Sequence, residues 1–288
     1  LQHRERMDRI ARSLLLKGPL SLGALAVTFA CTRSVAWAAV ATALAYAMVW
    51  WGYDRRSARL VAVDEPLCPR WNRQTLVRLT WLALPLGLVM MLISLNSNIP
   101  RYIIQRVLGE ADLGIYSAMA YLQVAGTTVV SALGQASSPR LAQSYANGDL
   151  SDFRRLLGRM VALAAALGVA GVLAAVLLGR PLLNLLYGAE YAARNDVFVW
   201  LMVAAGVAYV ASMLGYGLTA ARELRLQMPL FVSVCVVSLA CCALLVPAHG
   251  LSGAAIAAVA ASATQAGLSV LVLAHRRRCP TRPEMKVA

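Results

Sequence analysis

Long apolar runs, each of about 18 to 25 residues, recur along this chain and constrain its fold more than any other feature. A helix of that length crosses roughly 30 Å of hydrocarbon, because each residue adds about 1.5 Å. Within lipid every backbone amide needs a partner inside the protein, and spanning strands would be shorter and would alternate in polarity. The residues are 60% hydrophobic and only 14% charged, which is more apolar than one soluble core requires. The sequence therefore predicts an all-α integral membrane protein.

The apolar runs predict about eight transmembrane helices, separated by short polar or charged segments. Their expected bounds are Leu14–Cys31, Ser34–Tyr53, Leu79–Ile99, Leu113–Gln135, Met160–Leu178, Val197–Ala221, Pro229–Val246 and Leu251–Ala274.

Basic residues are distributed unequally between the two sets of loops that these spans define. The formal net charge is +14, which by itself could indicate a nucleic-acid partner. However, 22 of the 27 Lys and Arg residues fall on the side that holds both termini. By the positive-inside rule that side is cytoplasmic, so the charge reflects topology and no nucleic-acid partner is expected. The other side holds only Arg33, Arg101, Arg106, Arg180 and Arg194.

Residues with catalytic or metal-binding chemistry are scarce within the spans. The six cysteines form no CxxC pair and the three histidines are isolated, so we expect no metal site, disulfide framework or cofactor. All thirteen acidic residues lie outside the predicted spans. Membrane enzymes and many ion-coupled transporters use an intramembrane carboxylate. This pattern argues against an enzyme and predicts no catalytic residues.

The chain begins with Leu1 and a basic amphipathic segment that does not have the layout of a signal peptide. We therefore expect further helices upstream of this sequence.

Polar residues inside the spans concentrate at the end of the third. Asn96 and Asn98 precede Pro100 and Arg101 directly after a long apolar run. In one interpretation the asparagines cap a helix that Pro100 ends, and Arg101 binds lipid headgroups. In the other, Arg101 lies at the mouth of a polar cavity, where its planar guanidinium could bind phosphate oxygens and the asparagines could contact sugar hydroxyls.

The fourth span carries a second group of polar residues at intervals of four. Gln123, Thr127, Ser131 and Gln135 are successive i, i+4 neighbours, and this spacing places them along one helix face. Such a stripe could line an aqueous path. It could equally hydrogen-bond neighbouring helices together, at about 0.6 kcal/mol for each contact.

The segment after the fourth span predicts a short connector on the inner surface. Asn147 and Gly148 form a turn signal, and Ser151 is a plausible helix N-cap.

Several segments together resemble a known family. SLNSNIPRYIIQRVLGEADLGIYSAMAYLQVAGTTVVSALGQASSPRLAQSYANGDLSDFRRLL (residues 94–157) is similar to the core of bacterial polysaccharide flippases. These are the lipopolysaccharide and O-antigen repeat-unit exporters of the multidrug/oligosaccharidyl-lipid/polysaccharide exporter superfamily. PLLNLLYGAEYA (181–192), LTAARELRLQMPL (218–230) and HGLSGAAIA (249–257) agree with this resemblance.

The resemblance implies two helical bundles that face each other across a central cavity. Residues 1–78 would supply the final two helices of the N-terminal bundle and a cytoplasmic linker. Residues 79–275 would form a complete six-helix C-terminal bundle, and residues 276–288 a basic cytoplasmic tail.

The resemblance also implies a function: flipping lipid-linked oligosaccharide units across the bacterial inner membrane for cell-surface polysaccharide biosynthesis. The expected partners are a polyprenyl-diphosphate-linked oligosaccharide, membrane lipids and the polysaccharide polymerase machinery. Arg101 would engage the substrate together with Asn96 and Asn98, and Arg140 is a second candidate. The alternatives are a multidrug or small-cation exporter, and a membrane-embedded glycosyltransferase or ligase that would use Glu110 and Asp112.

Overall fold

The computed structural model describes residues 7–54, 72–221 and 224–275. The predicted all-α class is confirmed, since every regular element in these ranges is a helix. The chain divides into two compact units, Leu1–Leu76 and Val77–Ala288. The assignment of the first unit to an N-terminal bundle remains a prediction. The proposed basic tail and most of the proposed linker lie outside the described residues.

The first unit contains two helices that pack against each other, α1 (Met7–Thr32) and α2 (Val35–Val49), with the π-helical turn η2 (Trp50–Asp54) after them. Arg33 adopts a left-handed conformation, with φ at 47°, in the short connection between the helices. The two helices occupy the first two predicted spans.

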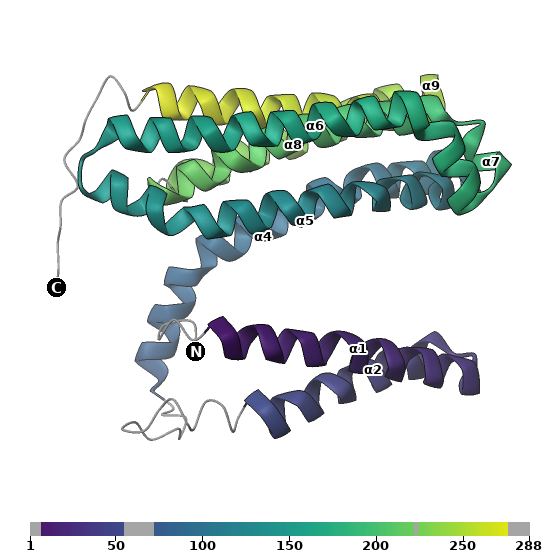
Figure 1. Cartoon of the computed structure of the whole chain (residues 1–288), viewed down its shortest axis with the longest axis horizontal. Coiled ribbons are helices and arrows are strands. Elements are labelled where there is room, and N and C mark those ends of the chain that lie inside the picture. The colour runs from purple at the N-terminus through teal and green to yellow at the C-terminus, as the bar shows by residue number, and fades with distance from the viewer. Residues whose placement is uncertain (1–6, 55–71, 222–223, 276–288) are drawn as a thin grey trace. The chain divides into compact units, whose positions relative to one another are not determined.

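The second unit consists of helices. In chain order they are α4 (Arg73–Val107, entering from the first unit), α5 (Glu110–Ala146), α6 (Leu150–Tyr187), the short α7 (Ala189–Ala192), α8 (Asn195–Ala220) and α9 (Leu224–His275). Of these, the long α5, α6, α8 and α9 pack side by side (Figure 1).

The element α9 is two helices in succession. Gly250 has φ 60° and ψ −136°, which a residue with a side chain rarely adopts, and this conformation ends the first helix. A Cβ at Gly253 would clash with the carbonyl oxygen of Leu245, so the two halves approach closely at the turn. Val234 and Ala261 share one buried cluster, as expected for helices that return along each other. The seventh and eighth predicted spans are therefore both present.

The third predicted span does not end at Pro100. α4 continues as a helix through the asparagines, Pro100 and Arg101 to Val107, so the interpretation of Asn96 and Asn98 as end caps is wrong. The physical reason is packing: Ile99 and Ile104 are buried in the core that joins α4 to α5, α8 and α9. This burial stabilises the helix beyond the proline, which removes a single hydrogen bond.

Helix α8 lies at the centre of the second unit and packs against α5, α6 and α9. Small residues permit the close approach: the Cβ that Gly168 of α6 lacks would lie 2.6 Å from the Cα atom of Gly206 in α8. Gly126 and Gly134 of α5 accommodate the rings of Tyr209 and Tyr216 in the same way. The positions of α5, α6 and α8 are thus fixed by glycine contacts.

The predicted short connector between α5 and α6 is a tight turn. Gly148 has φ 77°, and Asp149, not Ser151, is the N-cap of α6. The Asp149 carboxylate accepts hydrogen bonds from the Asp152 backbone N–H at 3.0 Å and from the Ser151 hydroxyl at 2.8 Å. These bonds hold the pKa of Asp149 below its usual value.

Six segments of the described residues are long and apolar enough to cross a membrane, and they include both halves of α9 as one segment. α4, which contains the third predicted span, is not among these six segments. The chain is a multi-pass membrane protein.

Candidate functional site

A cavity of about 620 Å³ lies among α4, α5, α8 and α9, and we call it the main cavity. Its lining on α5 extends from Tyr116 to Ser138, which is about 33 Å of helix at 1.5 Å per residue. That length is comparable to the hydrocarbon thickness of a bilayer. The main cavity therefore extends along the membrane-crossing part of the helices.

Arg101 contributes the positive charge of the main cavity. Its side chain is half-buried, and its Nη1 donates a hydrogen bond of 3.3 Å to Oδ1 of Asn98. Asn98 in turn donates to the Ser94 carbonyl at 2.8 Å. Asn98 does not itself line the cavity, so it positions the guanidinium. Arg101 forms no ion pair with any residue that the structure describes, and its remaining N–H groups can bind an anion.

Asn96 supplies an unpaired hydrogen-bond acceptor in the wall of the main cavity. Its Oδ1 atom is buried and has no hydrogen-bond partner among the described residues. A buried acceptor without a partner costs about 1 to 3 kcal/mol, so such groups are rare in folded proteins. A ligand that donates a hydroxyl hydrogen would remove that cost.

Three of the four predicted stripe residues on α5, namely Gln123, Thr127 and Ser131, line the main cavity. Gln135 is exposed and does not. Because successive residues turn by about 100°, each i, i+4 step drifts by about 40°, and Gln135 has turned about 120° from Gln123. Ser138, at about 60° from Gln123 by the same geometry, returns to the cavity.

Two further polar stripes complete the wall, and neither was among the predicted site residues. Ser212, Tyr216 and Thr219 of α8 face the main cavity at i, i+4, i+7 spacing. The second half of α9 adds another row at i, i+3, i+7 spacing: Ser262, Gln265 and Ser269. Both rows could have been found by searching every span for the helical period, as was done for the fourth.

Two tyrosine hydroxyls of α8 hydrogen-bond to the backbone of α5 in the wall of the main cavity. Tyr209 donates to the backbone carbonyl of Gln123 at 3.0 Å, and Tyr216 donates to that of Ser131 at 3.5 Å. Each ring packs over a glycine of α5, Gly126 and Gly134 respectively. These contacts fix the rotation of α5 so that its polar row faces the cavity.

The lining residues that the structure describes include no carboxylate. The acidic pair considered for catalysis lies elsewhere: Asp112 forms an ion pair with Arg194 at 3.0 Å, and Glu110 is exposed in the first turn of α5. Arg140 lies outside the main cavity, in a separate pocket between the end of α5 and the start of α6.

A family model described as "Polysaccharide biosynthesis protein" matches residues 2–196, which is more than half of the chain. The chain belongs to this polysaccharide biosynthesis family. It is also 30% identical over 179 residues to the capsular polysaccharide biosynthesis protein CapF of Staphylococcus aureus. That match covers 61% of this chain and 44% of CapF, so the chain spans less than half of that relative's length.

Solved structures of transporters share the fold. A point mutant of the MATE transporter VcmN of Vibrio cholerae has a TM-score of 0.74 at 15% identity, over 94% of this chain and 62% of that one. A MOP superfamily transporter of Pyrococcus furiosus, described by the reverse polarity of its binding pocket, has a TM-score of 0.71 at 15% identity, over 92% and 61%. At these identities the likeness shows a common fold and nothing finer.

Proposed function

We propose that the gene product containing this chain flips lipid-linked oligosaccharides across the bacterial inner membrane for cell-surface polysaccharide biosynthesis, without catalysing a reaction. One observation carries the proposal: the main cavity combines a half-buried arginine, an orphaned amide oxygen and three rows of neutral polar side chains. Membership of the polysaccharide biosynthesis family supports the same class of substrate.

The physical task explains this combination. A charged and hydrated headgroup must cross a region in which an unpaired charge or polar group costs several kcal/mol, while its lipid chain stays in the bilayer. Arg101 would neutralise part of a diphosphate with a bidentate contact, and Asn96 would accept a hydrogen bond from a sugar hydroxyl. The serine, threonine and glutamine rows would replace water along the path.

A multidrug resistance transporter shares the fold, and a multidrug or small-cation exporter is the second candidate function. The charge of the main cavity favours an anion instead, because Arg101 would repel a cation and no carboxylate among the described lining residues would attract one. Under this proposal the basic loops and both termini are cytoplasmic, and the protein works beside the polysaccharide polymerase machinery.

The test is removal of the gene from cells that make the polysaccharide. We expect lipid-linked sugar units to accumulate in the inner leaflet and the surface polymer to be lost, with both restored by the intact gene. Normal export without the gene, accompanied by new sensitivity to cationic drugs, would contradict the proposal and favour the second candidate.

A further inference from the structure

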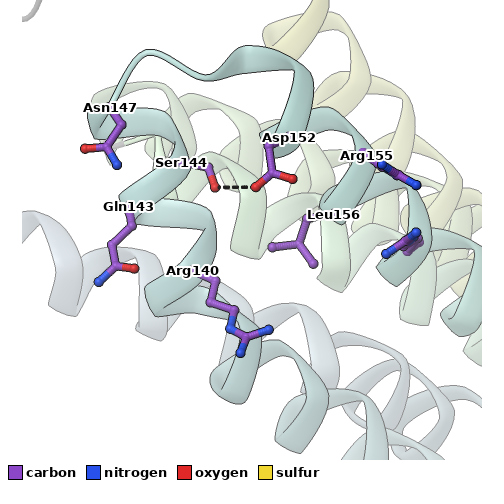
Figure 2. A pocket seen from close by; sticks show the side chains of 8 residues that line it. Arg140, Gln143, Ser144, Asn147, Asp152, Arg155 and Leu156 are labelled. Carbon is purple, nitrogen blue, oxygen red and sulfur yellow. Dashed lines mark hydrogen bonds between the residues drawn. The ribbon is translucent and has the colours of Figure 1, made fainter.

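The turn between α5 and α6 encloses a second pocket of about 540 Å³, which we call the arginine pocket. Arg140 from the end of α5 and Arg155 from the start of α6 line it (Figure 2), and Arg159 of α6 lines it as well. Arg155 and Arg159 are i, i+4 neighbours, so they lie on one face of α6. The pocket is thus built by two helices that the Asp149 cap and the Gly148 turn hold together.

Positive charge in the arginine pocket exceeds what the protein itself compensates. Asp152 is the one carboxylate among the described lining residues, and it accepts a hydrogen bond of 3.0 Å from Ser144 (Figure 2). None of the three arginines forms an ion pair within the described part of the chain. Three arginines and one aspartate leave a formal charge of +2.

The pocket also lies where lipid headgroups are found. α5 and α6 are both long and apolar enough to span a membrane, and the pocket is at the ends where they meet. Leu156 forms part of the pocket, and Leu163, two turns further along α6, is 54% exposed. A lipid can therefore place its headgroup among the arginines and its chain along the apolar surface of α6.

We propose that the arginine pocket binds a membrane lipid that carries two phosphate groups. Two phosphates match the charge of +2, and arginine binds phosphate oxygens in pairs through its planar fork. A phospholipid with two phosphodiesters and a polyprenyl diphosphate share this chemistry. The site is separate from the main cavity, and lipid binding there does not depend on what the main cavity carries.

The experiment measures lipid binding to the purified protein in neutral phosphatidylcholine nanodiscs. The probes are cardiolipin, undecaprenyl diphosphate and, with one phosphate, phosphatidylglycerol. We expect at least one of the two lipids with two phosphates to bind at least about fivefold more tightly than phosphatidylglycerol, since each added charge contact near the surface is worth about that factor. Which of the two binds identifies the source.

The variant R140Q/R155Q should lose at least about tenfold in affinity for the preferred lipid. R78Q/R154Q is the matched control, because it also removes one exposed arginine from each of two helices, and neither arginine lines the pocket. It should change affinity less than about twofold, and thermal unfolding checks that both variants fold. Equal losses in the two variants, or equal binding of all three lipids, would overturn the proposal by showing general charge attraction.

Discussion

The main cavity and the arginine pocket use positive charge in two different ways. The main cavity holds one half-buried arginine among neutral polar rows from three helices, whereas the arginine pocket holds three exposed arginines beside the turn between α5 and α6. Coulomb attraction grows as water is excluded, so a single buried charge can act strongly, while exposed charges are screened and act only as a group. Under the proposed function the anion is carried where there is one arginine rather than three, so the number of arginines does not identify the transport site.

The largest expected effect comes from removing the charge of the main cavity. Arg101→Gln should lower export of lipid-linked sugar at least about 30-fold, which corresponds to about 2 kcal/mol for a charge contact sheltered from water. Arg106→Gln is the control, because Arg106 lies on the same helix but is exposed and lines neither site. Export is measured as sugar units that reach the outer leaflet, at matched protein levels. Equal export by both variants would mean that the charge of Arg101 in the main cavity matters no more than an exposed charge on the same helix.

The wall of the main cavity should be sensitive to a single methyl group. Gly134→Ala places a Cβ against the ring of Tyr216 and should lower the free energy of unfolding by about 1 to 3 kcal/mol. Gly114→Ala, also in α5, meets open space and should leave stability unchanged or raise it by up to about 1 kcal/mol. Denaturation in detergent gives both values. If the two variants are equally stable, α8 does not fix the rotation of α5 through this contact.

Asn96 should show a trade between stability and function. Asn96→Leu removes an orphaned buried acceptor, so the free energy of unfolding should rise by about 1 kcal/mol while export falls. Asn98→Leu, the control, removes the partner of Arg101 and should bring no gain in stability. A loss of stability in Asn96→Leu would mean that this oxygen is satisfied in the folded protein.

The smallest effect concerns the turn that forms the arginine pocket. The pKa of Asp149 is lowered by hydrogen bonds from the Asp152 N–H and the Ser151 hydroxyl. Its ionised form therefore adds stability above the usual carboxyl pKa of about 3.9, and this contribution is lost as pH falls through the lower folded value. Asp149→Asn keeps an acceptor without the charge, so the difference in unfolding midpoint from wild type should shrink below about pH 4. A difference that is constant with pH would exclude this role.

The sequence predicted the helices well and the site only in part. The lengths of the apolar runs were enough to predict the eight helical segments, because the thickness of the bilayer fixes the length of a spanning helix. The course of α4 through Pro100 depended on burial of Ile99 and Ile104, and contacts between distant segments cannot be read from a local pattern. The N-cap of α6 also depended on a local contact. The carboxylate of Asp149 accepts the hydrogen bond from the free Asp152 N–H, so the helix begins before Ser151.

Prediction of the site residues was limited by rotation along the helix. Gln135 fits the i, i+4 pattern but has turned away from the cavity, whereas the spacing of seven that joins Ser131 to Ser138 returns to it. The rows on α8 and α9 have helical spacing like that of the row on α5, so the same period predicts them when it is sought in every span. Arg140 was grouped with Arg101 because the sequence does not reveal that α5 contributes to two separate pockets.

The central claim, that the polar row of α5 faces water rather than lipid, is tested most directly by thiol labelling. Thr127→Cys and Ser131→Cys, in a protein otherwise free of cysteine, should react with a membrane-impermeant maleimide, because the thiolate forms only in contact with water. Val129→Cys should not react. Val129 is 49% exposed on the same helix but does not line the cavity, so the account places its side chain in lipid, away from water. Added lipid-linked sugar should protect the first two. Equal labelling at all three positions, or labelling at Val129 alone, would contradict the account.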